Sequence, residues 1–136
     1  MKLRSLLIYT LASLLVVVIG HTAVTAQQKQ PVVVEVTLAP QASGEFTIQS
    51  SKTEFSTGVP YRFVVRNAGR KKHEVGIWRQ GEEDARAAVF AIEEDELLPN
   101  SVATRNATFS KSGEFEFACH FGNHYEKGMK LPIIVK

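Results

Sequence analysis

The sequence has 136 residues and is close to neutral, with 16 lysines and arginines against 14 aspartates and glutamates. Lys2 and Arg4 lie in an amino-terminal segment with the pattern of an export signal, in which an apolar run ends near small side chains. Without that segment the basic and acidic residues balance. Neither net charge nor any long basic block then predicts binding to nucleic acid or an anionic membrane.

Residues 1–26 are therefore expected to be a signal peptide that is cleaved after Ala26. The remaining residues, 27–136, are long enough for one compact domain with a single core and too short for two. The alternative is that the apolar run stays as a membrane anchor, but it is shorter than the roughly 20 residues that a spanning helix needs. We expect a periplasmic location, with membrane contact only if the signal is retained.

After residue 30 the chain follows the pattern of short β-strands, with alternating Val, Ile, Phe and Thr broken by Gly, Pro, Asn and Ser. A stretch near 82–98 differs, because it is rich in alanine and acidic residues, and it predicts a short helical excursion ended by Pro99. About seven strands at this spacing predict an all-β fold of two sheets packed face to face. The strands are expected near 31–38, 44–50, 60–67, 71–79, 102–110, 113–119 and 131–136.

Cys119 is the single cysteine of the sequence. Exported proteins meet an oxidising compartment in which thiols are normally paired. A lone cysteine there is buried and inert, pairs with another chain, or is protected as a metal ligand. Strand alternation places Cys119 on the same apolar face as Phe117, and it places His73 on the face of Val75. His120, next in phase, is expected to point outward as a surface residue near the rim.

The loop after Cys119 carries His124 and Met129 in the spacing C-x4-H-x4-M. A thiolate and two imidazoles with a weak axial thioether suit copper in both oxidation states. Zinc rarely takes a thioether, and hard cations take none of these groups. Each residue alone has a simpler explanation, as a core histidine, a packing methionine or an inert thiol. Their joint occurrence predicts one copper ion held by His73, Cys119, His124 and Met129.

These motifs resemble those of the cupredoxins, the small blue-copper proteins. The family carries one distant histidine on an inner strand, matched by His73, and a C-x(n)-H-x(n)-M loop near the carboxyl terminus, matched by Cys119, His124 and Met129. The wide C-x4-H-x4-M spacing is rusticyanin-like. The resemblance implies a Greek-key β-sandwich with one copper ion that cycles between Cu(I) and Cu(II). Where azurins and plastocyanins often place asparagine after the first histidine, this chain has Glu74.

The function that follows from the resemblance is one-electron transfer between redox partners, such as a c-type cytochrome or a terminal oxidase, by a monomeric protein. The acidic segment 82–96 is a candidate docking site for a basic partner. The alternative is copper binding or delivery in copper homeostasis or oxidase assembly, although one methionine and three histidines after residue 26 favour a single enclosed site. No catalytic residues are expected, because an enzyme needs an open coordination position or a second metal centre.

Overall fold

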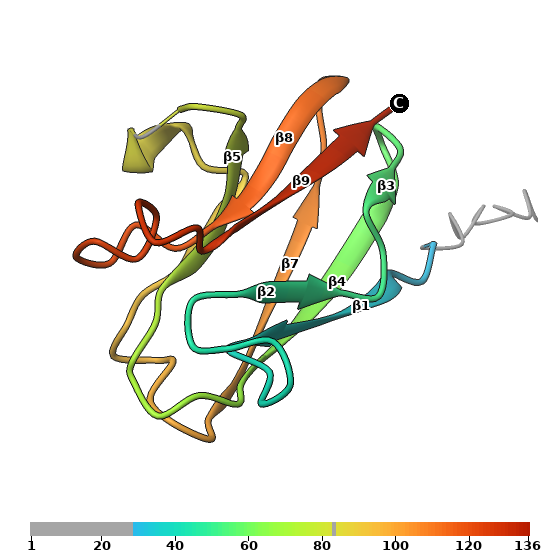
Figure 1. Cartoon of the computed structure of the whole chain (residues 1–136). Helices are drawn as coiled ribbons and strands as arrows, with labels where there is room; N and C mark the ends of the chain where they lie inside the picture. The colour runs from blue at the N-terminus through green and yellow to red at the C-terminus, as the bar shows by residue number, and fades with distance from the viewer. Residues whose placement is uncertain (1–28, 83) are drawn as a thin grey trace, which may run out of the picture.

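The computed structural model describes residues 29–82 and 84–136 (Figure 1). The expected signal peptide, 1–26, lies outside the described residues. Strands dominate this part of the chain, and they form two sheets that face each other. The two-sheet β-sandwich expected from the sequence is thus confirmed. None of the helices within these residues is both long enough and apolar enough to cross a membrane.

The first sheet has four strands in the order β2-β1-β4-β7. Its members are β1 (Val32–Leu38), β2 (Ile48–Ser50), β4 (Pro60–Asn67) and β7 (Val102–Thr108). β1 runs parallel to β4, and the other two pairings are antiparallel. Along β4, buried residues alternate with more exposed ones, which is the period of two that one solvated face imposes.

The second sheet has five strands in the order β3-β9-β8-β5-β6. Its members are β3 (Glu54–Phe55), β5 (Val75–Arg79), β6 (Phe90–Ile92), β8 (Gly113–Ala118) and β9 (Lys130–Val135). β5 and β8 are antiparallel neighbours at its centre, and β8 pairs with β9. The short strand β3 was not expected from the sequence, and it pairs parallel to β9.

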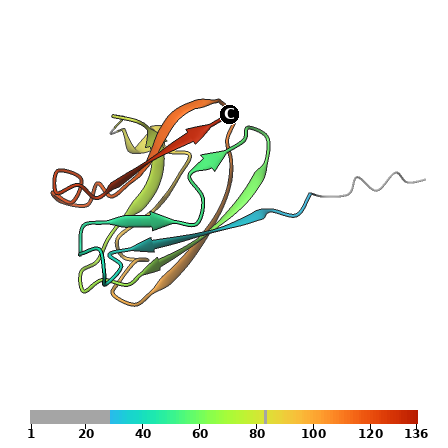
Figure 2. The ribbon, with the colours of Figure 1, turned by 45° about the vertical axis from the view of Figure 1, so that its right-hand side comes forward.

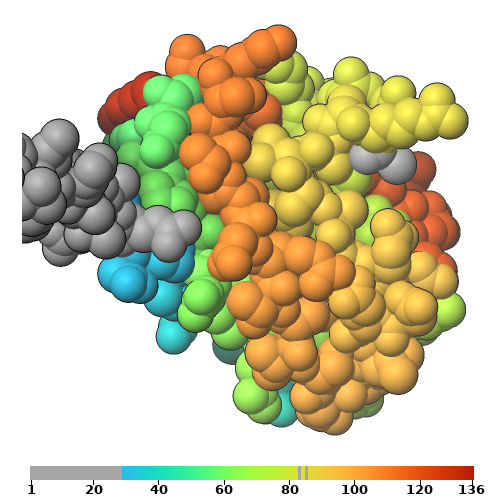
Figure 3. All heavy atoms as spheres, turned by 180° about the vertical axis from the view of Figure 1, so that it is seen from behind, coloured from blue at the N-terminus to red at the C-terminus, as the bar shows by residue number. Residues whose placement is uncertain are grey.

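The helical excursion expected near 82–98 is limited to one 3-10 turn, η1 (Ala85–Ala87). Phe90–Ile92 of the same segment is extended and pairs with the edge of β5, and residues 94–96 form a turn. Phe90 and Ile92 are buried on either side of Ala91, so pairing and core packing outweigh the helix propensity of the alanines. β6 of the second sheet contacts β7 of the first sheet at the edge of the sandwich. Figure 3 shows this side of the molecule.

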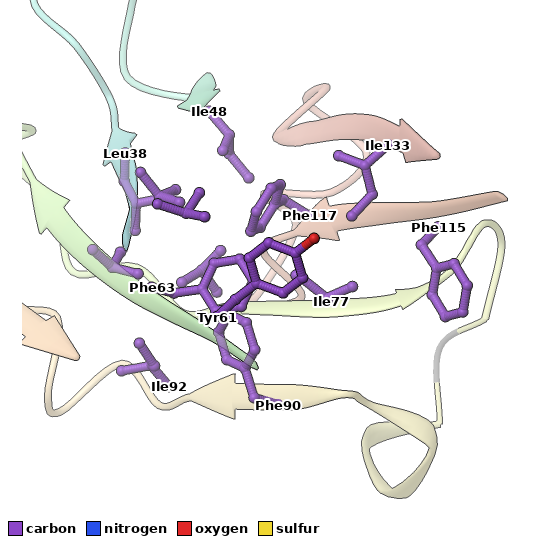
Figure 4. Packing of buried hydrophobic residues seen from close by; sticks show 14 of the residues in the cluster. Leu38, Ile48, Tyr61, Phe63, Ile77, Phe90, Ile92, Phe115, Phe117 and Ile133 are labelled. Atoms are coloured by element: carbon purple, nitrogen blue, oxygen red, sulfur yellow. The ribbon is translucent and has the colours of Figure 1, made fainter. Parts of the chain in front are cut away.

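Aromatic side chains from both sheets fill the space between them (Figure 4). Phe63 of β4 meets Phe117 of β8 at a ring separation of 5.9 Å, and it meets Phe90 of β6 at 4.8 Å. Phe55 of β3 contacts the rings of both Phe63 and Phe117. Burial of such rings is the main favourable term for a domain of this size. Buried residues of β5 and β8 belong to this core, which therefore holds the two central strands of the second sheet in place.

Candidate metal centre

The four predicted ligands come from two regions at one end of the sandwich. His73 lies two residues before β5, and Cys119 directly follows β8. Because Gly76 of β5 pairs with Ala118 of β8, these two ligands leave neighbouring strands close together. His124 and Met129 belong to the loop between β8 and β9, which projects away from the carboxyl terminus in both views (Figures 1 and 2).

Three of the predicted ligands form a compact cluster. The ligand atoms of His73, Cys119 and His124 all lie within 4.8 Å of one another. The Nδ1 atoms of the two histidines are 3.2 Å apart, and Cys119 Sγ is 3.4 Å from His124 Nδ1. His73 and Cys119 are fully buried, as their strand phase predicted, and His124 is 7 % exposed. One thiol and two imidazole nitrogens converge as a trigonal copper site requires.

Met129 is also fully buried, and backbone hydrogen bonds place it next to the cluster. Its N–H donates to the His124 carbonyl at 3.0 Å, and its own carbonyl accepts the N–H of Cys119 at 3.1 Å. Gly128 has a φ of 92°, a left-handed conformation that favours glycine, and this turn brings Met129 back toward Cys119. Metal binding by the four side chains stays a prediction; three of them cluster, and the backbone of the fourth is hydrogen-bonded to Cys119 and His124.

Asn67 ties down the loop that presents His73. Its buried side-chain nitrogen donates to the carbonyls of Lys71 at 2.8 Å and Leu97 at 2.7 Å, and its oxygen accepts the N–H of Gly69 at 2.9 Å. His73 donates its own N–H to the Leu97 carbonyl at 3.2 Å. His73 was expected within a strand starting at residue 71, but it sits in this pinned loop because β5 begins only at Val75.

Burial controls the protonation of the cluster. It raises the pKa of the Cys119 thiol to about 11, and the backbone N–H groups of Glu74 and Phe121 oppose this rise. Burial also lowers the pKa of His73 and of His124, which keeps both imidazoles neutral. Neutral imidazole is the form that binds metals, whereas the thiol must lose its proton. The two N–H groups near the sulfur can then donate to the thiolate.

Glu45 is part of the site, and sequence reasoning did not identify it. His73 Nε2 lies 3.1 Å from Glu45 Oε1, and the two residues are 28 positions apart. Although its burial opposes the effect, hydrogen bonds from the backbone N–H groups of Lys71 and Arg70 and from His73 lower the pKa of Glu45. No local motif or periodicity in the sequence connects a glutamate in the turn before β2 with a histidine in a later loop.

An aromatic rim surrounds His124. The ring of Phe46 lies 5.0 Å from the His124 ring, and that of Phe121 lies 5.5 Å from it. The ammonium of Lys127 lies 4.5 Å from the centre of Phe46, and that of Lys72 lies 4.8 Å from the centre of Phe121. The partly exposed edge of His124 is thus framed by two apolar rings, and a lysine ammonium group lies over each of them.

His120 does not join the metal cluster, which agrees with its outward strand phase. It is nevertheless half-buried, because its ring stacks on Tyr125 and meets Trp78 edge-on. Its Nε2 atom finds no hydrogen-bond partner among the described residues. The Tyr125 hydroxyl donates to Glu116 at 2.7 Å, so the ligand loop folds over the outer face of β8. That cover explains why a residue expected at the surface is enclosed.

Glu74 occupies the position at which azurins and plastocyanins often have asparagine. Its carboxylate is half-buried, and burial together with Glu93 raises its pKa, while the backbone N–H of His120 acts in the opposite direction. The side chain therefore reaches from the start of β5 to the backbone that follows Cys119. Residues around the primary ligands commonly orient a metal site, and Glu74 lies beside the backbone that carries the ligand loop.

Comparison with solved structures finds the same architecture in small copper proteins. Auracyanin from Roseiflexus castenholzii superposes with a TM-score of 0.59 at 19 % identity, over 80 % of this chain and 99 % of its own. Rusticyanin from Thiobacillus ferrooxidans gives a TM-score of 0.61 at 17 % identity, over 78 % and 77 % of the two chains. The chain therefore has the cupredoxin fold, and the resemblance seen in its sequence is confirmed.

Sequence comparison gives a second result. No protein-family model matches the chain. The copper-resistant cuproprotein CopI of Rubrivivax gelatinosus is 32 % identical over 58 % of this chain. The chain spans about half the length of this curated relative, since the match covers 53 % of CopI. The His73, Cys119 and His124 cluster, set in a cupredoxin fold, supports copper binding.

Proposed function

We propose that the protein binds one copper ion in a type 1-like site and carries single electrons between redox partners. The observation that carries this proposal is the enclosed cluster of His73, Cys119 and His124, whose ligand atoms lie within 4.8 Å of one another. Met129 is the proposed axial ligand, because its buried side chain follows a backbone that is hydrogen-bonded to both Cys119 and His124. Bound copper would supply the one-electron couple.

The protein's part in the proposed reaction is to hold the ligands still and to exclude water. The loop that carries His73 is held by the hydrogen bonds of Asn67 to Lys71 and Leu97, and the His73 ring contacts Glu45. Cys119 directly follows a central strand. Ligands that are anchored by the fold change little in position between two oxidation states, which keeps the barrier to electron transfer low. His124 has the only partly exposed ring of the clustered ligands, so its edge is the proposed exit for the electron.

The proposed partner is a redox protein, such as a c-type cytochrome or a terminal oxidase, that docks at the aromatic rim of Phe46 and Phe121. Lys72 pairs with Glu94 at 3.4 Å, so the acidic segment 82–96 reaches this rim and meets the basic residues there. Charges of both signs around a small apolar area are typical of short-lived complexes. We further propose a monomer in the periplasm, either released by cleavage after Ala26 or tethered by a retained signal.

Copper handling is the second candidate function, and the relative named as a copper-resistant cuproprotein is the observation that favours it. In this alternative the site stores or delivers copper in copper homeostasis or oxidase assembly. Delivery requires the metal to leave, whereas electron transfer requires it to stay. The buried ligands and the closed loop favour retention, so the electron carrier is the preferred function. Neither candidate is an enzyme.

The first experiment tests copper binding. Addition of Cu(II) to the purified protein should produce an intense thiolate-to-copper visible band, and Cys119→Ser should remove it with little effect on the fold. An unchanged band in that variant would contradict the proposed site. The second experiment separates the two functions by combining voltammetry with copper transfer to a chelator. Rapid reversible cycling with slow metal loss supports the carrier, and ready transfer of Cu(I) supports delivery.

A further inference from the structure

We infer that Glu45 is a positioning residue of the metal centre, which holds His73 as an Nδ1 ligand and makes the site prefer Cu(II) over Cu(I). The inference rests on the proposed copper site. It concerns a carboxylate that touches a predicted ligand on the side away from the cluster. His73 Nε2–H donates to Glu45 Oε1 at 3.1 Å, while His73 Nδ1 faces His124 Nδ1 at 3.2 Å.

The Glu45 carboxylate is itself fixed by the backbone. Its Oε1 atom accepts the N–H of Arg70 at 3.0 Å and the N–H of Lys71 at 2.9 Å, and its Oε2 atom lies 3.2 Å from the Arg70 nitrogen. These donors belong to the same loop that ends at His73. The carboxylate therefore has a defined place relative to the imidazole, and the contact does not depend on a freely moving surface side chain.

Gly69 makes room for this arrangement. A Cβ atom at Gly69 would lie 2.5 Å from Glu45 Oε1 and 2.6 Å from the Cβ of Ala39. The Ala39 atom adjoins the backbone and cannot move away easily, so a side chain at position 69 would force the carboxylate out. Gly69 also donates its N–H to Asn67, which keeps the loop at this distance. The close approach of the glutamate is thus built into the backbone.

The chemical consequence concerns both nitrogens of the His73 ring. A carboxylate that accepts the Nε2 proton selects one tautomer and leaves the Nδ1 lone pair directed at the cluster. The negative charge also makes the imidazole a stronger donor, and this favours the more highly charged Cu(II) ion. Many metal-binding histidines are oriented in this way, with one ring nitrogen on the metal and the other donating its N–H to a carboxylate. Loss of such an outer partner typically costs 10- to 100-fold in metal affinity.

A purely structural role is the competing explanation, because Glu45 also ties the turn before β2 to the loop at residues 69–71. Glu45→Gln separates the two explanations. The amide oxygen can accept the same N–H groups, so the loop contact is retained while the charge is lost. Glu54→Gln is the matched control, since Glu54 is an exposed glutamate on β3 that pairs with Lys136. Gly69→Ala displaces the carboxylate without removing it.

The test compares the copper-loaded wild-type protein with these variants. Glu45→Gln and Gly69→Ala should lower the affinity for Cu(II) relative to Cu(I) by about tenfold or more. Voltammetry measures the ratio of the two affinities directly, because a tenfold loss of Cu(II) affinity relative to Cu(I) raises a one-electron potential by about 59 mV. In the Cu(I) form, nitrogen NMR should detect a proton on His73 Nε2 in the wild type and a shifted Nε2 resonance in Glu45→Gln. Glu54→Gln should leave both signals unchanged.

A reduction potential in Glu45→Gln equal to that of the wild type would overturn the inference, and so would a His73 proton on Nδ1. A loss of folding stability without a change in potential would assign Glu45 the structural role alone. The copper site has a separate readout. If the wild-type protein forms no thiolate-to-copper band, the proposed function fails, and the NMR measurement on the metal-free protein still decides which nitrogen of His73 carries the proton.

Discussion

Replacement of Asn67 by alanine should destabilise the domain and loosen the metal centre together. The side chain is fully buried and makes three hydrogen bonds, to the carbonyls of Lys71 and Leu97 and from the N–H of Gly69. A hydrogen bond contributes about 1 kcal/mol, and a buried polar group left without a partner costs about 1–3 kcal/mol. We therefore expect the free energy of unfolding to fall by about 3 kcal/mol or more.

Urea denaturation of the metal-free protein measures this loss, with an expected decrease in the midpoint of about 1–3 M. Asn106→Ala is the matched control, because Asn106 is exposed and accepts one long hydrogen bond of 3.3 Å from Arg62. The copper band of Asn67→Ala should also weaken, since the loop that carries His73 loses its anchor. If Asn67→Ala costs under about 1 kcal/mol, or no more than Asn106→Ala, the reasoning is refuted.

Three further predictions concern protonation and strand packing. Burial lowers the pKa of His73 and His124, so the unfolded chain binds more protons than the folded chain below pH 6.5. The free energy of unfolding of the metal-free protein should therefore fall from pH 7 to pH 5. A constant value contradicts this prediction. The pKa of Cys119 is raised to about 11, so the thiol must lose a proton before it binds copper between pH 7 and 9. The apparent copper affinity, measured by competition with a chelator, should therefore rise about tenfold per pH unit. An affinity that does not change with pH would exclude thiolate binding. Gly76→Ala should lower the free energy of unfolding by about 1–3 kcal/mol, because the added Cβ would lie 2.5 Å from the Phe90 carbonyl oxygen. Urea denaturation measures this loss. A variant as stable as the wild type would show that β6 can move away.

Much of the fold was predictable because strand alternation is a local signal. β4 buries the alternate residues that the sequence indicates, and the inward direction of Cys119 follows from the same count along β8. In β8 itself the opposite face is covered as well, since Glu116 and Ala118 are buried together with Phe115 and Phe117. The ligand loop is local too, since His124 and Met129 lie within ten residues of Cys119. The segment near 82–98 was not predictable from local signals. Its alanines favour helix, but the free edge of β5 offers Phe90–Ile92 backbone partners and a place in the core.

The sequence by itself determined the class of fold and indicated the candidate ligands, because alternation and the spacing of Cys119, His124 and Met129 are properties of neighbouring residues. The tertiary structure decided which groups surround these candidate ligands. Glu45 reaches His73 across 28 residues only because the turn before β2 packs on the loop after β4. Contacts of this kind depend on how separate segments fold together, and no periodicity records them. The candidate ligands could thus be proposed from the sequence, and the groups that surround them could not.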